Sequence, residues 1–243
     1  MGVENRAGPA SPDAGGSWAR LAEETRSAWA RSPFAELSAK ASAYVLQGAT
    51  ETDFDAGDAL PPPPSSPGQD ASLFIVVSGL VRTFRVSGTR QVTTRYSGPS
   101  DLVGIPSVIR HGSSARGKVV TDARMLRLVS SRVRELVRHD AGSAWVVMGE
   151  LARLHDAALD MACNNVFLSV RQRVARHLLD LAVQEQPAGL VVHASHQDIA
   201  DAIGSVREVV SRVIRELRTE GLVTRSGDTI VLPNPAGLVE RQR

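Results

Sequence analysis

The stretch HASHQDIADAIGSVREVVSRVIRELRTEGLVTRSGDTIVL, residues 193–232, decides the fold of the last third of this chain. Near its start, Ser195 and Asp198 have the spacing of a capping box, with Asp in place of the usual Glu, and they predict the beginning of a short helix. Gly204 follows where a tight turn between two helices needs a residue without a Cβ. The stretch therefore opens with a helix and a turn.

A second helix is predicted directly after that turn. Ser205 and Glu208 match a complete capping box, and the helical pattern continues to about Arg218. Its buried face is predicted from apolar residues at helical spacing, which are Val209, Val213, Ile214 and Leu217. Residues 221–232 then contain two β-rich runs joined at 226–228, which predict a wing. Together these elements indicate a winged helix-turn-helix, whose second helix enters the major groove of DNA.

The polar face of the second helix carries side chains that can read bases. They lie near the start of the helix and are Arg207, Glu208, Ser211 and Arg212. Arg can donate two hydrogen bonds to O6 and N7 of guanine, and Glu can accept one from N4 of cytosine. The alternative is a solvated face in which Glu208 pairs with Arg212. The turn, the caps and the wing around this face favour DNA binding.

The composition of the chain fits a globular protein of one large domain or two ordinary ones. Its 243 residues are 42% hydrophobic and 22% charged, and the net charge of +2 does not by itself argue for nucleic acid. The lone Cys163 excludes an internal disulfide framework and any four-cysteine metal or iron–sulfur site. The sequence contains neither an apolar run of membrane-spanning length nor a secretory signal, and a cytoplasmic protein is expected.

The first half of the chain changes from a tail to a β-rich domain. Residues 1–27 are expected to form a flexible N-terminal tail, although a helical pattern already begins at Trp18. Short β-rich runs then follow at regular spacing, and they cover residues 72–77, 80–86, 91–96, 118–121 and 125–129. Gly and Ser separate these runs, which predicts a small sandwich or barrel, with a hairpin turn at 87–89.

A long helix is predicted after the β-rich domain. Seven residues, all but Asn165 apolar, repeat at alternating spacings of four and three: Val147, Leu151, Leu154, Ala158, Met161, Asn165 and Leu168. Such a seam is typical of two helices that pack as a coiled coil. The alternative is that the stripe packs on its own barrel, but the length of the helix favours dimerisation. Ser169 and Gln172 then form a capping box that starts another helix, from Val170 to about Gln184.

From about Phe34 to Leu232 the chain resembles the cyclic-AMP receptor/Fnr family of bacterial transcription regulators. The motifs that carry the resemblance lie at residues 33–37, 54–57, 73–82, 98–104, 167–176 and 203–212. The family implies an α+β fold with a cyclic-nucleotide-binding-like β-roll (a double-stranded β-helix), a long dimerisation helix and a C-terminal winged helix-turn-helix. The corresponding domains are residues 28–140, 141–168 and 169–243.

The resemblance also implies roles for single residues. Arg207, Glu208 and Arg212 match positions that read TGTGA-like half-sites, whereas Ser211 with Glu208 and Arg212 matches the Fnr-type pattern for TTGA-like half-sites. The half-site sequence therefore stays open between the two. Ser195 and Gln197 match positions that contact DNA phosphates, and Ser205 is counted with the DNA-binding residues.

The predicted effector pocket departs from the family pattern. Ile105 follows Gly104 where the family has Glu, the loop at 112–117 lacks the Arg-Ser pair, and Ala158-Leu159 replaces the Thr-Ser pair that holds adenine. A cyclic phosphate would lack its charge-assisted anchor, so we expect no cyclic-AMP binding in the usual mode. An exposed loop is favoured over an anion site made by Ser113, Ser114 and Arg116. The sequence does not identify an effector; a nucleotide and no effector at all are both compatible with it, and no cofactor is assigned.

Two other classes of function were weighed against a DNA-binding regulator. A cupin-like metal enzyme needs several His on neighbouring strands, but only His111 lies in the β region, and one His near a loop is also weak evidence for haem. No catalytic or metal-binding residue is therefore assigned. An adaptor without DNA affinity is disfavoured by the intact basic face. We expect a homodimer that binds a palindromic site in double-stranded DNA and contacts RNA polymerase, with no membrane partner.

Overall fold

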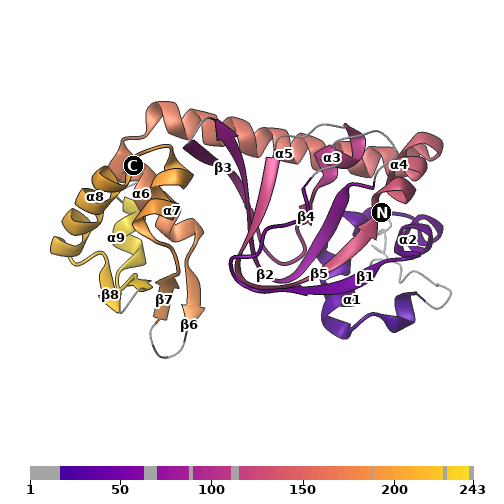
Figure 1. Ribbon diagram of the computed structural model, residues 1–243, viewed down its shortest axis with the longest axis horizontal. Coiled ribbons are helices and arrows are strands. Elements are labelled where there is room, and N and C mark those ends of the chain that lie inside the picture. Colours follow the sequence, from indigo (N-terminus) through magenta and orange to yellow (C-terminus); the bar gives the residue numbers. More distant parts are fainter. Residues whose placement is uncertain are drawn as a thin grey trace, which may run out of the picture. The chain divides into compact units, whose positions relative to one another are not determined.

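The computed structural model describes residues 17–62, 70–87, 90–110, 115–185, 187, 189–226 and 229–240 (Figure 1). These residues divide into two compact units. The first contains those up to Phe84 together with Arg95–Asp156, and the second contains Arg85–Thr94 together with those from Ala157 onward. The boundary between the units falls inside the long helix, so the division differs from the predicted domains.

Helical segments come before the first strand of the first unit. They are η1 (Trp18–Arg20), α1 (Glu23–Arg31), η2 (Pro33–Glu36) and α2 (Ala39–Leu46). The prediction of a flexible tail that extends to residue 27 is wrong in its last part, because α1 begins at Glu23 and buries Thr25 and Trp29. The Trp29 ring lies 5.9 Å from the ring of Phe34, and burial of these aromatic side chains holds α1 in place. Residues 1–16 lie outside the described part of the chain.

The β-roll contains a five-stranded sheet, of which all but the segment Arg85–Thr94 belongs to the first unit. Its strands are β1 (Thr50–Phe54), β2 (Ser72–Ser87), β3 (Arg90–Ser97), β4 (Leu102–Val103) and β5 (Ala115–Val129). They are ordered β1-β5-β2-β3, and β4 pairs with β2. The antiparallel register of β1 and β5 places Thr50 opposite Arg127 and Phe54 opposite Ala123.

Two of these strands are longer than the sequence predicts. The pattern predicts a break at Gly79 and another between 121 and 125, yet β2 and β5 run through both places. A Cβ at Gly79 would lie 2.4 Å from the backbone oxygen of Asp122 and 2.6 Å from the Cβ of Ala123. Glycine here lets β2 approach β5 closely instead of ending the strand.

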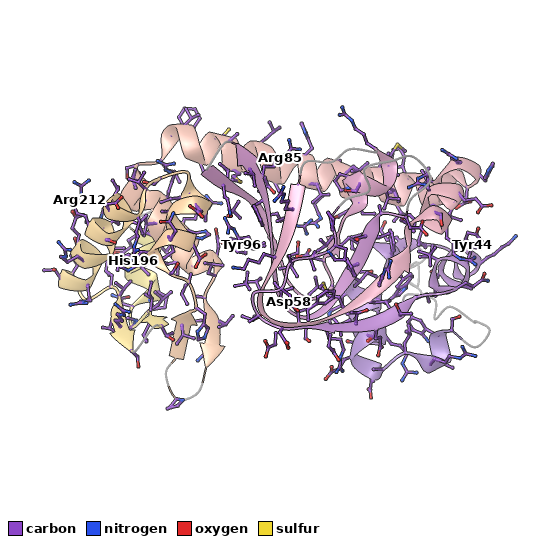
Figure 2. The ribbon with its side chains drawn as sticks, viewed as in Figure 1. Tyr44, Asp58, Arg85, Tyr96, His196 and Arg212 are labelled. Carbon is purple, nitrogen blue, oxygen red and sulfur yellow. The ribbon has the colours of Figure 1, made fainter. Side chains whose placement is uncertain are left out.

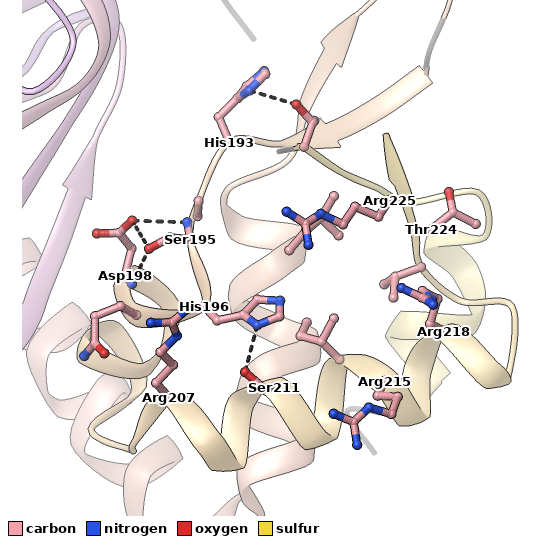
Figure 3. A pocket seen from close by; sticks show the side chains of 16 residues that line it. His193, Ser195, His196, Asp198, Arg207, Ser211, Arg215, Arg218, Thr224 and Arg225 are labelled. Atoms are coloured by element: carbon pink, nitrogen blue, oxygen red, sulfur yellow. Dashed lines mark hydrogen bonds between the residues drawn. The ribbon is translucent and has the colours of Figure 1, made fainter. Parts of the chain in front are cut away.

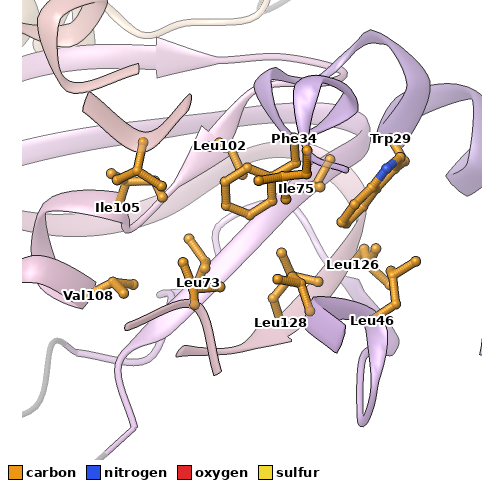
Figure 4. Close-up of a cluster of buried hydrophobic side chains, with 14 of the residues drawn as sticks. Trp29, Phe34, Leu46, Leu73, Ile75, Leu102, Ile105, Val108, Leu126 and Leu128 are labelled. Carbon is orange, nitrogen blue, oxygen red and sulfur yellow. The ribbon is translucent and has the colours of Figure 1, made fainter. Parts of the chain in front are cut away.

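A core of buried side chains joins the helices of the first unit to its strands. Phe34, Leu73 and Leu126 belong to it and are 0–1% exposed (Figure 4). The short helix α3 (Ile105–Ile109) and the helix α4 (Ser130–His139) also contribute buried apolar residues. Each large apolar side chain buried in this way stabilises the fold by about 1.5–3 kcal/mol.

The long helix α5 (Ala141–Phe167) begins on this core. Val147 is buried in the core and Leu151 packs against it. The carboxylate of Glu150, a residue only 3% exposed, accepts a hydrogen bond of 2.8 Å from Nε of Arg153. The first half of α5 is therefore packed on its own β-roll.

The second unit contains helices and a small sheet (Figure 1). Its elements after α5 are α6 (Val170–Asp180), β6 (Val183–Glu185), β7 (Gly189–Val192), α7 (His196–Ile203), α8 (Arg207–Thr219), β8 (Thr224–Ser226), β9 (Thr229–Val231) and α9 (Pro235–Glu240). The sheet has the order β6-β7-β9-β8 with antiparallel neighbours. The hairpin β8–β9 is the predicted wing, although residues 227 and 228 of its turn are not described.

Helix α6 begins as predicted and ends early. The side chains of Ser169 and Gln172 form the predicted capping box. The helix ends at Asp180, however, and not near Gln184, because residues 183–185 pair with β7 as a strand. Pairing with a neighbouring strand has overridden the local helical pattern.

Candidate nucleic-acid interface

Helix α7 has the cap that the sequence predicts. The Ser195 hydroxyl accepts from the backbone N–H of Asp198, and the Asp198 carboxylate accepts from the backbone N–H of Ser195. Gly204 ends the helix with φ +65°, a left-handed conformation that glycine adopts without strain. The N–H of Ser205 then donates to the carbonyl of Ala200, which closes the end of α7. The helix-turn-helix therefore has a defined turn.

Helix α8 starts differently from the prediction. Its N-cap is Val206, and no side chain caps it, so the predicted capping box at Ser205 and Glu208 is wrong. The backbone N–H of Ser205, which the Glu208 side chain would need for its half of a capping box, already donates to the carbonyl of Ala200. The buried face also differs from the prediction: Val210 is fully buried, whereas the predicted Val209 is half-buried.

Ion pairs and hydrogen bonds fix α8 and α7 to the helix before them. Arg171 on α6 donates to the carboxylate of Glu220 at 2.5 and 2.6 Å and to Glu216 at 3.4 Å. Arg173 on the same helix donates to the carbonyl of Ile203 at 2.6 Å. Both contacts with Glu220 come from one guanidinium nitrogen, Nη2, at an exposed site. Together with the hydrogen bond of Arg173, they join α6 to the ends of α8 and α7.

A groove of about 930 Å³ lies between α7, α8 and the wing (Figure 3). Four arginines line it, with Arg207, Arg215 and Arg218 from α8 and Arg225 from β8. A concave surface with this charge attracts an anionic backbone such as that of DNA.

The structure places the predicted base-reading residues on one helix. Arg207 and Ser211 line the groove. Glu208 and Arg212 are exposed on α8, and Figure 2 shows Arg212 on the outside of that helix. Because Arg207, Glu208 and Arg212 are all exposed, they are free of the interior of the monomer.

The predicted phosphate-contacting residues are already hydrogen-bonded within α7. The Ser195 hydroxyl donates to the Asp198 carboxylate at 2.6 Å as part of the cap. The Gln197 amide donates to the Asp201 carboxylate at 2.8 Å on the exposed side of the helix. Ser205 is half-buried in the turn and does not line the groove. These residues support the helix-turn-helix in the unliganded chain.

One residue of the groove was missed from the sequence. Nδ1 of His196, at the start of α7, lies 2.8 Å from the Oγ of Ser211 on α8. Burial lowers the pKa of His196 below its ordinary 6.5, and the positive charges of Arg225 and Arg207 lower it further. No signal in the sequence joins the two residues, because they are 15 positions apart and meet only through the packing of α7 on α8.

The predicted effector residues are only partly brought together. Gly104 and Arg116 line a small cavity of about 100 Å³ in the β-roll. Apolar side chains fill the neighbouring interior, among them Phe74, Val119 and Met125 at 0–1% exposure. Ala158 and Leu159 are exposed on α5. Ser113, Ser114 and the considered haem ligand His111 lie outside the described residues.

The predicted dimer seam along α5 is only partly accessible in the single chain. Val147 is 2% exposed, because the β-roll covers it, and so it is unavailable to a second chain. Leu151, Leu154 and Met161 are half-buried, Ala158 is exposed, and the side chain of Asn165 is not described. A mostly apolar exposed face lies one position further along the helix, and its residues are Trp145, Met148, Ala152, His155, Leu159, Ala162 and Val166.

Two kinds of feature are absent from the described residues. None of their helices combines the length and the apolar character that a membrane crossing requires. No three His, Cys, Asp or Glu side chains in this part of the chain are grouped closely enough to hold a metal ion.

The sequence of this chain is similar to known regulators. Residues 172–241 match the Crp-like helix-turn-helix domain. The cyclic AMP receptor protein of Thermus thermophilus is 35% identical over 172 residues, which cover 70% of this chain and 78% of that protein. The cAMP-activated global transcriptional regulator CRP of Haemophilus influenzae is 28% identical over 174 residues, covering 68% and 77% of the two chains.

Solved structures show the same fold. A transcriptional regulator of the CRP/FNR family, also from Thermus thermophilus, has a TM-score of 0.66 at 27% identity and covers 79% of this chain and 98% of its own. A regulator of the crp/fnr family from Eubacterium rectale has a TM-score of 0.72 at 20% identity, covering 86% and 97%. The predicted α+β fold, with a cyclic-nucleotide-binding-like β-roll and a C-terminal winged helix-turn-helix, is confirmed.

Proposed function

This chain belongs to the CRP/FNR family of transcription regulators, and from that premise we propose that it reads a palindromic DNA site as a homodimer. One observation carries the proposal. The groove between α7, α8 and the wing is open and is lined by four arginines, one of which is Arg207. On the same helix α8, Glu208 and Arg212 are also exposed. Phosphate contacts would position the protein, and these three side chains would read base edges.

The half-site stays open between two sequences. Arg207, Glu208 and Arg212 fit a TGTGA-like half-site, and Ser211 with Glu208 and Arg212 fits a TTGA-like one. All four side chains sit on α8, so the structure supports either reading. Two such helices related by a two-fold axis would contact half-sites about one turn of DNA apart.

The homodimer would form through the exposed apolar face of α5 defined above. Trp145 is 74% exposed, Leu159 51% and Val166 76%, and their positions repeat at the three- and four-residue spacing of a coiled coil. We expect Leu159→Asp to shift the protein toward monomer in analytical ultracentrifugation. Val239→Asp, which changes an exposed valine of α9, is the matched control and should leave the dimer intact. A dimer that survives Leu159→Asp and other charges on this face would contradict this arrangement.

The proposed effector site is degenerate. Its cavity of about 100 Å³ is small beside the 300–1,000 Å³ of ordinary ligand pockets, and apolar residues fill the interior next to it. A cyclic phosphate would also meet Ile105, which is fully buried, where a polar partner would be needed. We therefore propose that DNA binding does not require cyclic AMP bound in the usual mode.

Selection of bound sequences from a random DNA pool tests the proposal as a whole. The full-length protein is used alone, with cyclic AMP and with cyclic di-GMP. We expect an inverted repeat to be enriched equally in all three selections. Enrichment of no sequence would refute site-specific binding, and enrichment only with cyclic AMP would refute the degenerate pocket.

A further inference from the structure

His196 and Ser211 form a polar pair on the wall of the groove. His196 is the first residue of α7, and Ser211 lies in the second turn of α8. Both are half-buried, and Nδ1 of the imidazole lies 2.8 Å from the serine oxygen (Figure 3). A residue that is expected to face bases is thus tied to a group that can change its protonation.

The direction of this hydrogen bond depends on the tautomer and the charge of the imidazole, because Nδ1 donates whenever it carries a hydrogen. A neutral ring with its proton on Nε2 leaves Nδ1 as an acceptor, so the Ser211 hydroxyl must donate its only hydrogen to His196. A protonated ring carries hydrogen on both nitrogens, so Nδ1 donates and the hydroxyl hydrogen of Ser211 is released. With the neutral ring protonated on Nε2, the Ser211 hydroxyl can only accept a further hydrogen bond. With the protonated ring, it can donate one to another group.

The charges around His196 favour the neutral ring in the free protein. The groove residues of α8 are Arg207, Arg215 and Arg218, the wing supplies Arg225, and His193 precedes α7. The one carboxylate among the residues that line the groove is Asp198, which is engaged with Ser195. Burial, followed by Arg225 and Arg207, lowers the pKa of His196. The ring is therefore neutral near pH 7.

Bound DNA would reverse this balance. Phosphates entering the groove would neutralise Arg207 and Arg225, and their negative charge would favour the imidazolium. The pKa of His196 would rise on binding, so the complex would take up a proton. By linkage, affinity increases as the pH falls through the interval between the raised pKa of the complex and the lowered pKa of the free protein. The gain is at most about tenfold for each unit of that rise.

We propose that His196 is a positioning residue that decides whether Ser211 donates to a base edge or accepts from one, and that DNA binding draws a proton onto it. The inference rests on the proposed function, because it requires α8 in the major groove. Neutral His196 with its proton on Nε2 would suit adenine N6 or cytosine N4 opposite Ser211, which are donors. Protonated His196 would suit thymine O4 or guanine O6 and N7, which are acceptors.

The first test measures DNA affinity against pH on the duplex enriched from the random pool. Fluorescence anisotropy is recorded between about pH 5.5 and 8 at fixed salt, and wild type should bind several-fold more tightly at the lower end. His196→Asn places an amide near the position of Nδ1 but cannot titrate, so its affinity should change little with pH. His193→Gln removes the other histidine of the groove and should keep the wild-type change with pH, whatever its effect on affinity. His139→Gln, an exposed site on α4, serves as the distant control.

The second test measures base preference. Duplexes altered one position at a time are compared at the two ends of the pH range. Wild type should change its preference at one position of each half-site by several-fold, while Ser211→Ala and His196→Asn should show no change with pH. This readout separates positioning of Ser211 from a simple gain of charge, which would strengthen binding to all duplexes alike.

A third measurement needs no variant that might fold poorly. The ring proton resonances of His196 are titrated by NMR in free and DNA-bound wild type, and the pKa should be higher in the complex. An equal pKa in both states would overturn the inference, as would a pH profile that persists in His196→Asn or disappears in His193→Gln. Failure of the proposed function looks different, because no duplex would then be bound specifically at any pH.

Discussion

The interior of the β-roll and the groove of the winged helix-turn-helix are both concave, but different side chains occupy them. In the roll, Phe74, Val76 and Met125 are fully buried and leave a cavity of about 100 Å³. In the groove, long charged side chains stand around about 930 Å³ of open space. Apolar side chains gain free energy by filling a hollow, whereas arginines lose hydration when they do so and remain at its rim.

The comparison bears on the proposal that the cyclic-nucleotide site is degenerate, since a shared fold does not by itself imply a shared ligand. The roll keeps the strands of a cyclic-nucleotide-binding-like domain, yet its own side chains take up the interior. The groove keeps both the helices and an accessible charged surface. Substitutions confined either to the interior of the β-roll or to the groove can therefore separate effects on stability from effects on DNA binding.

The largest effect is expected on stability, from removing one large buried side chain of the β-roll. Phe74→Ala removes a side chain that is 1% exposed and packs at 5.9 Å from the ring of Phe54. The free energy of unfolding should fall by about 3–5 kcal/mol, through lost burial and a new cavity. Urea denaturation can follow this through tryptophan fluorescence, since Trp18, Trp29 and Trp145 all belong to the first unit. Ile109→Ala, at an exposed site, should cost far less; equal losses would mean that the roll is not closed by packing.

A smaller effect is expected from removing one base-reading side chain in the groove unit. Arg207→Ala and Arg212→Ala should each weaken specific binding by about 1–3 kcal/mol and relax base preference at one position. Arg138→Ala, on α4 of the first unit, is the matched control and should bind as wild type does. Affinity is measured on the selected duplex and on random DNA. An equal loss on both would assign these arginines to phosphate contacts.

The N-cap of α7, a helix that lines the groove, should contribute about 1 kcal/mol to the stability of the protein. Ser195→Ala removes the hydroxyl that accepts from the backbone N–H of Asp198, and such losses cost about 0.5–2 kcal/mol. Ser205→Ala is the matched control, because Ser205 caps no helix in the structure. Thermal unfolding of the second unit, followed by circular dichroism, compares the two. If Ser205→Ala destabilised as much as Ser195→Ala, the start of α8 would be misassigned.

The smallest effect is expected in the salt dependence of binding. Arg218→Gln removes one positive charge from the rim of the groove. The plot of log affinity against log salt should then lose about 0.9 of its slope, which corresponds to one phosphate contact. Because a phosphate contact carries no base preference, the substitution should weaken binding to all duplexes alike. An unchanged slope would place Arg218 outside the DNA interface.

Prediction from sequence succeeded where the signal is local. The caps at Ser195 and Ser169 and the left-handed Gly204 involve groups only a few residues apart, so spacing alone identifies them. Prediction failed where a neighbour in space decides. Ser205 has the right spacing for a cap but is used by the turn before α8, and residues 183–185 have a helical pattern but pair with β7.

The candidate site shows the same division. The exposed arginines and glutamate of α8 follow from helical periodicity, because burial of one face fixes the other. The contact between His196 and Ser211 does not follow from it, since the angle at which α7 packs on α8 determines which side chains meet. Similarly, the face of α5 that remains exposed depends on which face the roll covers, and not on the heptad pattern alone.

By itself, the sequence determined a winged helix-turn-helix with a basic recognition helix, because caps, turns and amphipathic periods are short-range properties of the chain. Only the tertiary structure decided that the roll fills its own interior, that Val147 is covered and that His196 holds Ser211. These outcomes depend on packing between segments distant in the chain. The free energy of burial depends on which surfaces pack together, and the sequence of one strand or helix does not identify the element it packs against.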